Sequence, residues 1–421
     1  MQAQEPASIT VIPEMVVGED VYYQACVQAI SPNHRYVAGP AYNLNDGTYG
    51  MFVYDIETKN YNVQAALDDF GADIRDVNND GVATGYNLQA CFLNIDGTVE
   101  YFEAADNEST IARDASDDLS VAVGCYYLTD GFLTTACVWK DGVRSDLPVP
   151  SDEDLGFETN GSSAFYTNSD GSVIVGYVVD NFSTNPLIVW RLQDDGTYVC
   201  DPVCTRYFSP DGDVEGRPYM VFAPQGLSRN GRYVSLGLAV SDPDIMITEQ
   251  YLGRLDLESG DLETYRADGS GEFEQNTEFV PTQVSDNGTV IGYTSMGWGP
   301  MSQRNAIIWQ KGKTPTKLAT LLPDITEIAA YDNVGMNTAI DITPDGRYIA
   351  GFAMDENYAY NGYVIDIGSE AAGVKAVKVA DGEAAVEVAR YGINGTRLAA
   401  PVKGVNIVKM SDGTVKKVIV K

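Results

Sequence analysis

One short motif occurs seven times in the 421-residue sequence. It runs from Ser, Thr or Asn through a turn, which is Asp-Gly or Asn-Gly in five copies, into a β-rich run that ends in Gly. The closing glycines lie 39 to 61 residues apart, at Gly39, Gly85, Gly124, Gly176, Gly237, Gly292 and Gly351. Asp-Gly and Asn-Gly between β-rich runs favour a tight hairpin, because both residues tolerate positive φ. A variable repeat of about fifty residues is typical of propeller blades.

A second element follows each copy of the motif. It is a short, nearly continuous apolar run, such as Leu187-Ile-Val-Trp or Ala306-Ile-Ile-Trp. Strands that bury both faces have this composition. With one strand before the turn and a polar strand after the apolar run, each unit predicts a four-stranded sheet. Such sheets bury both faces when they are arranged radially. We therefore predict an all-β fold, with a seven-bladed β-propeller over residues 8–367.

The two ends of the repeat region complement each other. The seventh unit lacks a fourth strand after Tyr363-Val-Ile-Asp. Residues 8–13 precede the first unit, whose inner strand we expect at 22–30. We predict that 8–13 supply the missing outer strand, since Pro13 is tolerated at a sheet edge.

The charge is strongly negative and unevenly distributed. The chain holds 27 Lys and Arg against 60 Asp and Glu, a net charge of −33. Residues 374–421 hold nine Lys and Arg against four Asp and Glu, so this segment carries +5 and the rest carries −38. A surface this acidic repels phosphate backbones, which argues against nucleic acid as a partner. No apolar run approaches the roughly 18 residues of a membrane span.

The repeat units resemble known propeller repeats. Val284-Ser-Asp-Asn-Gly-Thr-Val-Ile-Gly-Tyr followed by Ala306-Ile-Ile-Trp-Gln-Lys-Gly is similar to the HAF repeats of bacterial extracellular proteins. Thr343-Pro-Asp-Gly-Arg-Tyr-Ile-Ala is similar to WD-type repeats. The resemblance implies a fold and an extracellular setting, and it implies no activity, because propellers host unrelated functions.

The C-terminal segment resembles the sorting domain of the Bacteroidetes type IX secretion system. The resemblance rests on Arg390-Tyr-Gly-Ile-Asn-Gly-Thr-Arg-Leu, Lys403-Gly-Val-Asn-Ile-Val and Lys416-Lys-Val-Ile-Val-Lys421. The Pro-Asn-Pro opening of that family is absent. The resemblance implies a small β-sandwich-like domain at 374–421 after a linker at 368–373, with export to the cell surface and possible outer-membrane association. The alternative is a small β-sandwich that caps the propeller. We interpret the N-terminus as the start of a mature chain after signal removal.

Catalytic and cofactor motifs are scarce. The single histidine, His34, lies in a motif turn, so a Ser-His-Asp triad is not predicted. No phosphate-binding or dinucleotide fingerprint occurs. We therefore predict no catalytic residues and no cofactor. The acidic segment 150–158 is interpreted as a solvated loop. Cys91 and Cys137 occupy equivalent strand positions, which predicts buried thiols.

One segment resembles the start of a calcium loop. Asp76, Asn78 and Asp80 supply alternate oxygens before Gly81. The twelfth position, however, is Asn87 instead of a bidentate Glu. The hairpin that all units share also explains the segment, so we favour a turn without metal and keep calcium as the weaker alternative.

Aromatic residues gather in the loops that should share one rim of the propeller. The candidate ligand-binding residues are Tyr42, Tyr127, Phe132, Phe182, Trp298, Tyr358 and Tyr360. Exposed rings stack on sugars and anchor peptides. We predict a secreted or cell-surface binding or scaffold propeller that recognises glycan or peptide. The alternatives are a carbohydrate-active hydrolase or lyase that uses rim carboxylates, and a purely structural surface protein.

Overall fold

The computed structural model divides the chain into two compact units, residues 1–372 and 373–421. The structure describes residues 6–23, 26–67, 72–128, 133–155, 158–180, 187–200, 207–208, 219–242, 247–275, 277–296, 303–368, 387–392, 397–398, 400–410 and 415–420. Within this part of the chain, no helix is both long and apolar enough to cross a membrane.

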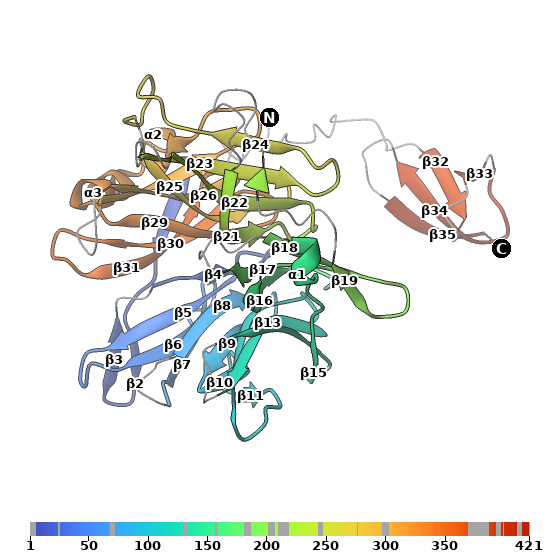
Figure 1. Ribbon diagram of the computed structural model, residues 1–421, viewed down its shortest axis with the longest axis horizontal. Coiled ribbons are helices and arrows are strands. Elements are labelled where there is room, and N and C mark those ends of the chain that lie inside the picture. The colour runs from blue at the N-terminus through green and yellow to red at the C-terminus, as the bar shows by residue number, and fades with distance from the viewer. Residues whose placement is uncertain are drawn as a thin grey trace. The chain divides into compact units, whose positions relative to one another are not determined.

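The first unit is built from antiparallel sheets that follow one another along the chain (Figure 1). The second sheet contains β8 (Ala72–Val77), β9 (Val82–Asn87), β10 (Gln89–Asn94) and β11 (Val99–Tyr101). The third contains β12 (Glu108–Ala115), β13 (Val121–Leu128), β14 (Thr135–Lys140) and β15 (Val143–Asp146). The fourth contains β16 (Thr159–Thr167), β17 (Val173–Asp180), β18 (Leu187–Leu192) and β19 (Tyr198–Cys200). The sixth contains β25 (Glu278–Val284), β26 (Val290–Met296), β27 (Gln303–Trp309) and β28 (Thr316–Lys317).

Two sheets carry additional strands. The fifth contains β20 (Tyr207–Phe208), β21 (Tyr219–Leu227), β22 (Tyr233–Asp242), β23 (Ile247–Asp256) and β24 (Leu262–Tyr265). The first contains β2 (Met15–Val17), β3 (Asp20–Tyr23), β4 (Ala29–Ile30), β5 (Tyr36–Asn43), β6 (Tyr49–Asp55) and β7 (Tyr61–Ala65). Both β3 and β4 pair with β5. The inner strand expected at 22–30 is therefore divided into two short strands, β3 and β4, which both pair with β5.

The seventh sheet joins the two ends of the unit. It contains β29 (Asn337–Ile342), β30 (Tyr348–Met354), β31 (Tyr360–Asp366) and the N-terminal β1 (Ser8–Val11). β1 pairs with β31 from Ser8↔Asp366 to Val11↔Tyr363. The pairing of the N-terminal segment with the last repeat, predicted from the sequence, is therefore present. Each sheet also contacts the next, and β4 contacts β29 and β30, so the described sheets form a closed ring.

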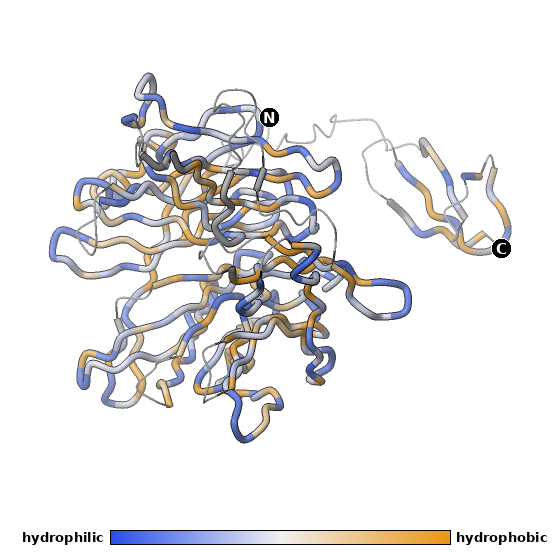
Figure 2. The backbone as a smooth tube through the Cα atoms, viewed as in Figure 1, coloured by the Kyte–Doolittle hydropathy of each residue, from blue (hydrophilic) through white to orange (hydrophobic). Residues whose placement is uncertain are grey.

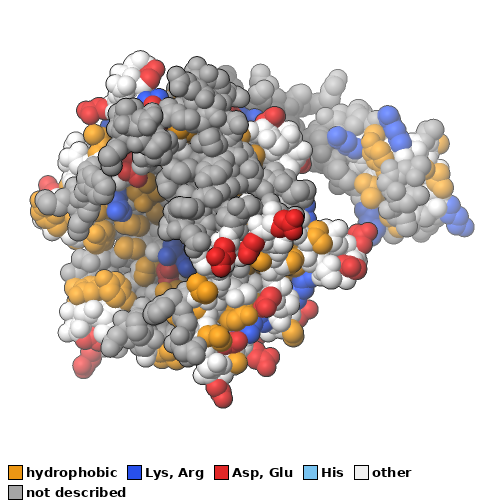
Figure 3. Space-filling view, viewed as in Figure 1, with side chains coloured by type: hydrophobic (Ala, Val, Ile, Leu, Met, Phe, Trp, Pro, Cys, Tyr) orange, Lys and Arg blue, Asp and Glu red, His pale blue; other side chains and the backbone are white. Residues whose placement is uncertain are grey.

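The core lies between neighbouring sheets. Trp139, Trp190 and Trp309, which end the apolar third strands, are buried. Cys91 and Cys137 are buried thiols, as predicted. Figure 2 shows hydrophobic stretches along the strands and hydrophilic stretches at the turns. Figure 3 shows acidic side chains at several places on the face of the first unit that is in view.

Three helices occur between the strands of the described residues. They are α1 (Asp152–Leu155), α2 (Leu318–Leu321) and α3 (Thr326–Val334). α1 lies within the acidic segment that the sequence analysis treated as a loop. α3 buries Ile328 and Tyr331 against the core of the last two sheets, and it ends at Gly335, where φ is 85°. The strand-based analysis did not predict these helices.

The closing glycine of the motif faces a β-bulge. In β8 the pairing register shifts between Ile74 and Asp76, and Ile74 pairs with Gly85. A Cβ on Gly85 would lie 2.0 Å from the carbonyl oxygen of Asp73. The same shift occurs in β12, β16, β21, β25 and β29. The glycine is thus required because the bulged inner strand approaches it too closely for a side chain.

The motif turns are linked to one another. The backbone N–H of Asp117 donates to the carbonyl of Ser169 at 2.9 Å, and the N–H of Ser169 donates to the carbonyl of Arg229 at 2.8 Å. Equivalent bonds join Asn33 to Asn79, Asn78 to Asp117, Asn230 to Asp286 and Asp286 to Pro344. The turns therefore share one face of the ring, here called the turn face; the opposite face is the loop face.

The second unit has one described sheet, in the order β33-β32-β34-β35. Its strands are β32 (Glu387–Gly392), β33 (Arg397–Leu398), β34 (Gly404–Met410) and β35 (Val415–Val420). Arg390 is buried, and its guanidinium donates to the Oδ1 of Asn406 at 3.1 Å. The segments compared with the sorting domain thus include strands.

Candidate functional site

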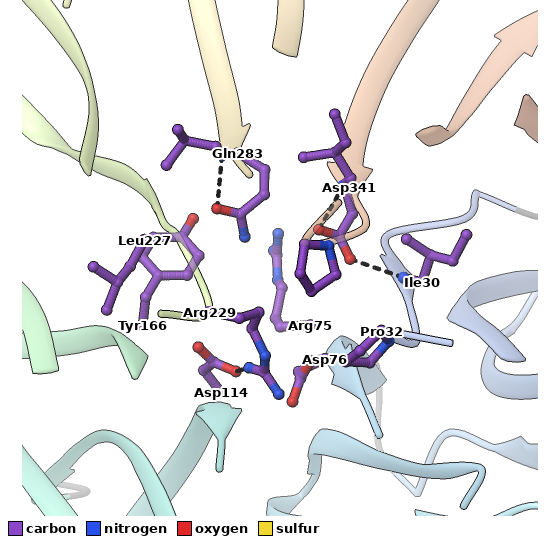
Figure 4. A pocket seen from close by; sticks show the side chains of 13 residues that line it. Ile30, Pro32, Arg75, Asp76, Asp114, Tyr166, Leu227, Arg229, Gln283 and Asp341 are labelled. Atoms are coloured by element: carbon purple, nitrogen blue, oxygen red, sulfur yellow. Dashed lines mark hydrogen bonds and ion pairs between the residues drawn. The ribbon is translucent and has the colours of Figure 1, made fainter. Parts of the chain in front are cut away.

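The bulged inner strands point side chains at the axis of the ring. The bulged residues and their neighbours enclose a cavity of about 80 Å³, here called the loop-side cavity. It is lined by Gln28, Arg75, Arg113, Phe165, Tyr166, Thr282, Gln283, Ile340 and Asp341. A second cavity of about 30 Å³, the turn-side cavity, continues towards the turns (Figure 4). It adds Ile30, Pro32, Asp76, Asp114, Leu227, Arg229, Val284, Ile342 and Pro344.

Arg229 lies at the turn end of this channel. It belongs to the turn of the fifth sheet, yet its guanidinium lies 3.3 Å from the carboxyl of Asp114 and 2.5 Å from that of Asp117, both in the third sheet. It also donates to the carbonyl of Ala115 at 3.2 Å. Figure 4 shows Arg229 beside Asp114 at the base of the channel.

The channel carboxyls tie neighbouring sheets together. Oδ2 of Asp114 accepts the backbone N–H of Thr167 at 2.7 Å, and its Oδ1 accepts that of Ala115 at 2.8 Å. Oδ2 of Asp341 accepts the N–H of Ile30 at 2.8 Å, across the closure between the last and the first sheet. These bonds satisfy backbone donors that the bulges leave outside the strand ladders.

Burial alters the acid–base behaviour of these carboxyls. Burial, followed by the charge of Asp76, raises the pKa of Asp114 well above its usual range, and Arg229 opposes that rise. Burial raises the pKa of Asp341 to about 7, although the N–H of Ile30 opposes the rise. Burial therefore favours the neutral form of both carboxyl groups, whereas the Arg229 guanidinium favours the charged form of Asp114.

The loop-side cavity has a different character. Arg75 forms an ion pair with the carboxyl of Asp73 at 2.6 Å. Arg113 lies over the ring of Phe165, with its guanidinium carbon 4.9 Å from the centroid. The Nε of Arg113 and the Oε1 of Gln28 are buried and have no hydrogen-bond partner among the described residues. These two atoms can therefore form hydrogen bonds with a molecule in the cavity.

The described rim aromatics come from three sheets. Tyr42 is half-buried and packs edge-to-face on Tyr49, with centroids 5.3 Å apart. Tyr127 is half-buried at the end of β13, and Tyr360 packs on Phe352 at 6.0 Å. Tyr358 is 75% exposed. These tyrosines come from the first, third and seventh sheets. Phe132, Phe182 and Trp298 lie outside the described residues.

The calcium-like segment is used as a turn. Oδ1 of Asn78 accepts the backbone N–H groups of Asp80 and Val82, both at 3.0 Å. Asp76 instead lines the turn-side cavity. No group of three or more His, Cys, Asp or Glu side chains suited to a metal ion occurs among the residues described. His34 also lies in its turn, stacked on Tyr348 at 3.9 Å.

The channel residues, except Asp76 of the calcium alternative, were not among the predicted site residues, although the sequence carries a signal for them. Five pairs of them stand two and three positions before the first residue of a motif, as Arg75 and Asp76 stand before Asn78. The same offset gives Arg113 and Asp114, then Phe165 and Tyr166, Thr282 and Gln283, and Ile340 and Asp341. An alignment of the seven units on the motif would have placed these residues in two adjacent columns.

Comparison with known proteins finds only weak similarities. No family model matches the chain, and no curated protein matches it. Among solved structures, similarity is found to an oligogalacturonate lyase in complex with manganese, at 11% identity and a TM-score of 0.49, over 87% of this chain and 98% of that one. The β-propeller domain of the Trilobed protease from Pyrococcus furiosus has 14% identity and a TM-score of 0.42, over 75% and 95%. A GH74 xyloglucanase from Xanthomonas campestris has 11% identity and a TM-score of 0.42, over 84% and 53%.

These similarities are too weak to indicate what the chain does. The class of fold follows from the chain itself, because repeated antiparallel sheets in a closed ring are the architecture of a β-propeller.

Proposed function

We propose that residues 8–367 form a seven-bladed β-propeller that binds glycan or peptide at the loop-face end of its channel. The N-terminal strand closes the last blade. The protein acts as a binding or scaffold module at the cell surface.

One observation carries this proposal. The channel narrows from about 80 Å³ to about 30 Å³ towards the turn face, where Arg229 and its carboxyl partners lie, and the loop-side cavity presents Arg113 and Phe165. A pocket that combines aromatic rings with a few polar groups is the usual form of a small-ligand site.

The carboxyl groups favour binding over hydrolysis. Both oxygens of Asp114 and of Asp341 accept backbone N–H groups, so these side chains already serve the fold. A hydrolase or lyase remains the second candidate. It rests on Asp76, whose charge raises the pKa of the buried Asp114, because two adjacent carboxyl groups are the minimum needed for acid–base chemistry.

The binding test uses the full-length protein on a glycan array and a peptide library, with hits measured by calorimetry. Phe165→Ala should weaken a genuine hit at least tenfold, because Phe165 lines the loop-side cavity. Phe92→Ala is the matched control, since Phe92 is also half-buried in ring contact but lines neither channel cavity. Product analysis of each hit separates the candidates. If a hit is converted to product and this turnover is lost in Asp76→Asn, the protein is an enzyme instead of a binding module. If no ligand is found, a purely structural role is favoured.

Export is proposed through the C-terminal unit, acting as a sorting domain of the type IX kind. Its net positive segment and its strands at the compared positions support this proposal. In a bacterium with that secretion system, full-length protein should reach the cell surface. Protein without residues 374–421 should remain in the periplasm. Equal surface delivery of both would contradict the proposal.

A further inference from the structure

The loop-side cavity stands out by its charge. Outside residues 374–421 the chain carries −38, yet two arginines, Arg75 and Arg113, line this small cavity. The carboxyl group in its lining, Asp341, has both oxygens engaged by backbone N–H groups. The lining of this cavity is therefore richer in cationic side chains than the net charge of the chain would predict.

The two arginines differ in their partners. Arg75 is paired with Asp73 at 2.6 Å, and its side chain is 45% exposed. Arg113 has the ring of Phe165 as its neighbour, and no hydrogen bond or ion pair to its guanidinium occurs within the described residues. Arg113 interacts electrostatically with Asp73, but the Asp73 carboxyl already forms an ion pair with Arg75. A partly buried guanidinium without an anion is costly, so Arg113 is set to receive one.

We infer that the loop-side cavity binds the carboxylate of a ligand, with Arg113 as its ion-pair donor. This inference rests on the proposed function and names the chemistry of its ligand. A guanidinium holds a carboxylate through two parallel N–H donors, and Phe165 keeps the guanidinium plane in place from one side. Tyr166 and Gln283 add polar groups to the same wall.

The size of the cavity limits how the ligand enters. A volume of about 80 Å³ is far below the roughly 300–1,000 Å³ that encloses a drug-sized molecule. The cavity therefore takes a terminal group, while the rest of the ligand lies towards the loop face. Two sources supply such a group: the uronic-acid end of an acidic glycan, and the C-terminal carboxylate of a peptide.

The experiment titrates full-length protein with four probes in two matched pairs. Glucuronic acid is compared with glucose, and a short peptide acid is compared with its amide. We expect one acid to bind at least tenfold more tightly than its neutral counterpart, and the pair that shows the difference identifies the source. Equal binding within both pairs, or no binding of either acid, would overturn the inference.

Variants test the role of Arg113. Arg113→Gln should weaken the acid at least tenfold, and Arg113→Lys should retain part of the affinity. Arg144→Gln is the matched control, because Arg144 lies in the same sheet over the ring of Tyr126 at 4.0 Å but pairs with Glu108 away from the channel. Unchanged acid binding in a folded Arg113→Gln would overturn the inference.

The outcomes separate this inference from the proposed function. If the neutral forms of the array hits bind as tightly as the acid forms, the carboxylate site is contradicted and the proposed binding function is retained. Binding of the small acids without any glycan or peptide hit would keep the carboxylate site and remove the proposed function.

Discussion

The guanidinium of Arg229 lies 2.5 Å from the carboxyl of Asp117 and so joins the fifth sheet to the third across the end of the channel. This pair spans 112 residues of sequence and bypasses the fourth sheet. It therefore links two sheets that are not adjacent in the ring.

Replacing Arg229 should destabilise the whole first unit. Arg229→Met removes the partner of Asp114 and Asp117, and loss of one member of a buried pair costs about 3–5 kcal/mol. Arg232→Met is the control, because its pair with Asp256 is more exposed and worth about 0–1 kcal/mol. Urea denaturation checks both, and equal losses would contradict the role given to Arg229.

A side chain at a closing glycine should be poorly tolerated. Gly124→Ala would place a Cβ 1.9 Å from the carbonyl oxygen of Ile111, so the bulge of β12 must shift. We expect a loss of about 3 kcal/mol, near the upper end for overpacking. Gly271→Ala has open space around its Cβ and should cost little. A Gly124→Ala protein that melts like the parent would show that the bulge is not rigid.

Deleting the N-terminal strand should open the ring. β1 pairs with β31, and Ile12 and Met15 behind it are buried, each contributing about 1.5–3 kcal/mol of burial. Removal of residues 1–17 should therefore lower the melting temperature clearly and expose a sheet edge that promotes aggregation. Removal of 374–421 should change the melting temperature of the first unit little, because that segment lies in a separate unit. The reverse ranking would contradict the closure.

Stability should decline as the pH rises towards neutrality. Burial raises the pKa of Asp341 to about 7, whereas an unfolded aspartate titrates near about 3.9. Between these values the folded state holds a proton on Asp341 that the unfolded state has released. The stability that this proton contributes is complete below about pH 4 and is lost as the pH rises through 7. Asp341→Asn should flatten this slope in urea midpoints measured between pH 5 and 8. Exposed Asp324→Asn should leave the slope unchanged. A parent protein whose midpoint rises over this range would refute the assignment.

Much of the fold was predictable because it is repeated. The Asp-Gly turns, the apolar strands ending at Trp139 or Trp190, and the complementary ends all leave local patterns in the sequence. The short α3 leaves none in an analysis built on strands. It is held by burial of Ile328 and Tyr331 against distant sheets.

The candidate site was harder to predict, for a physical reason. The positions before each motif must bulge, but any side chain that fits the axis satisfies the fold there. Arg113, Phe165 and Thr282 are accordingly unlike one another although they are equivalent in structure. Their convergence depends on closure of the ring, which pattern and spacing alone do not reveal.

The most direct test of the account is a crystal structure of the full-length protein with the strongest ligand from the array. The account predicts that the ligand's terminal group occupies the loop-side cavity, against Arg113 and Phe165, with the remainder towards the loop face. A ligand bound elsewhere, with the cavity unchanged, would contradict it.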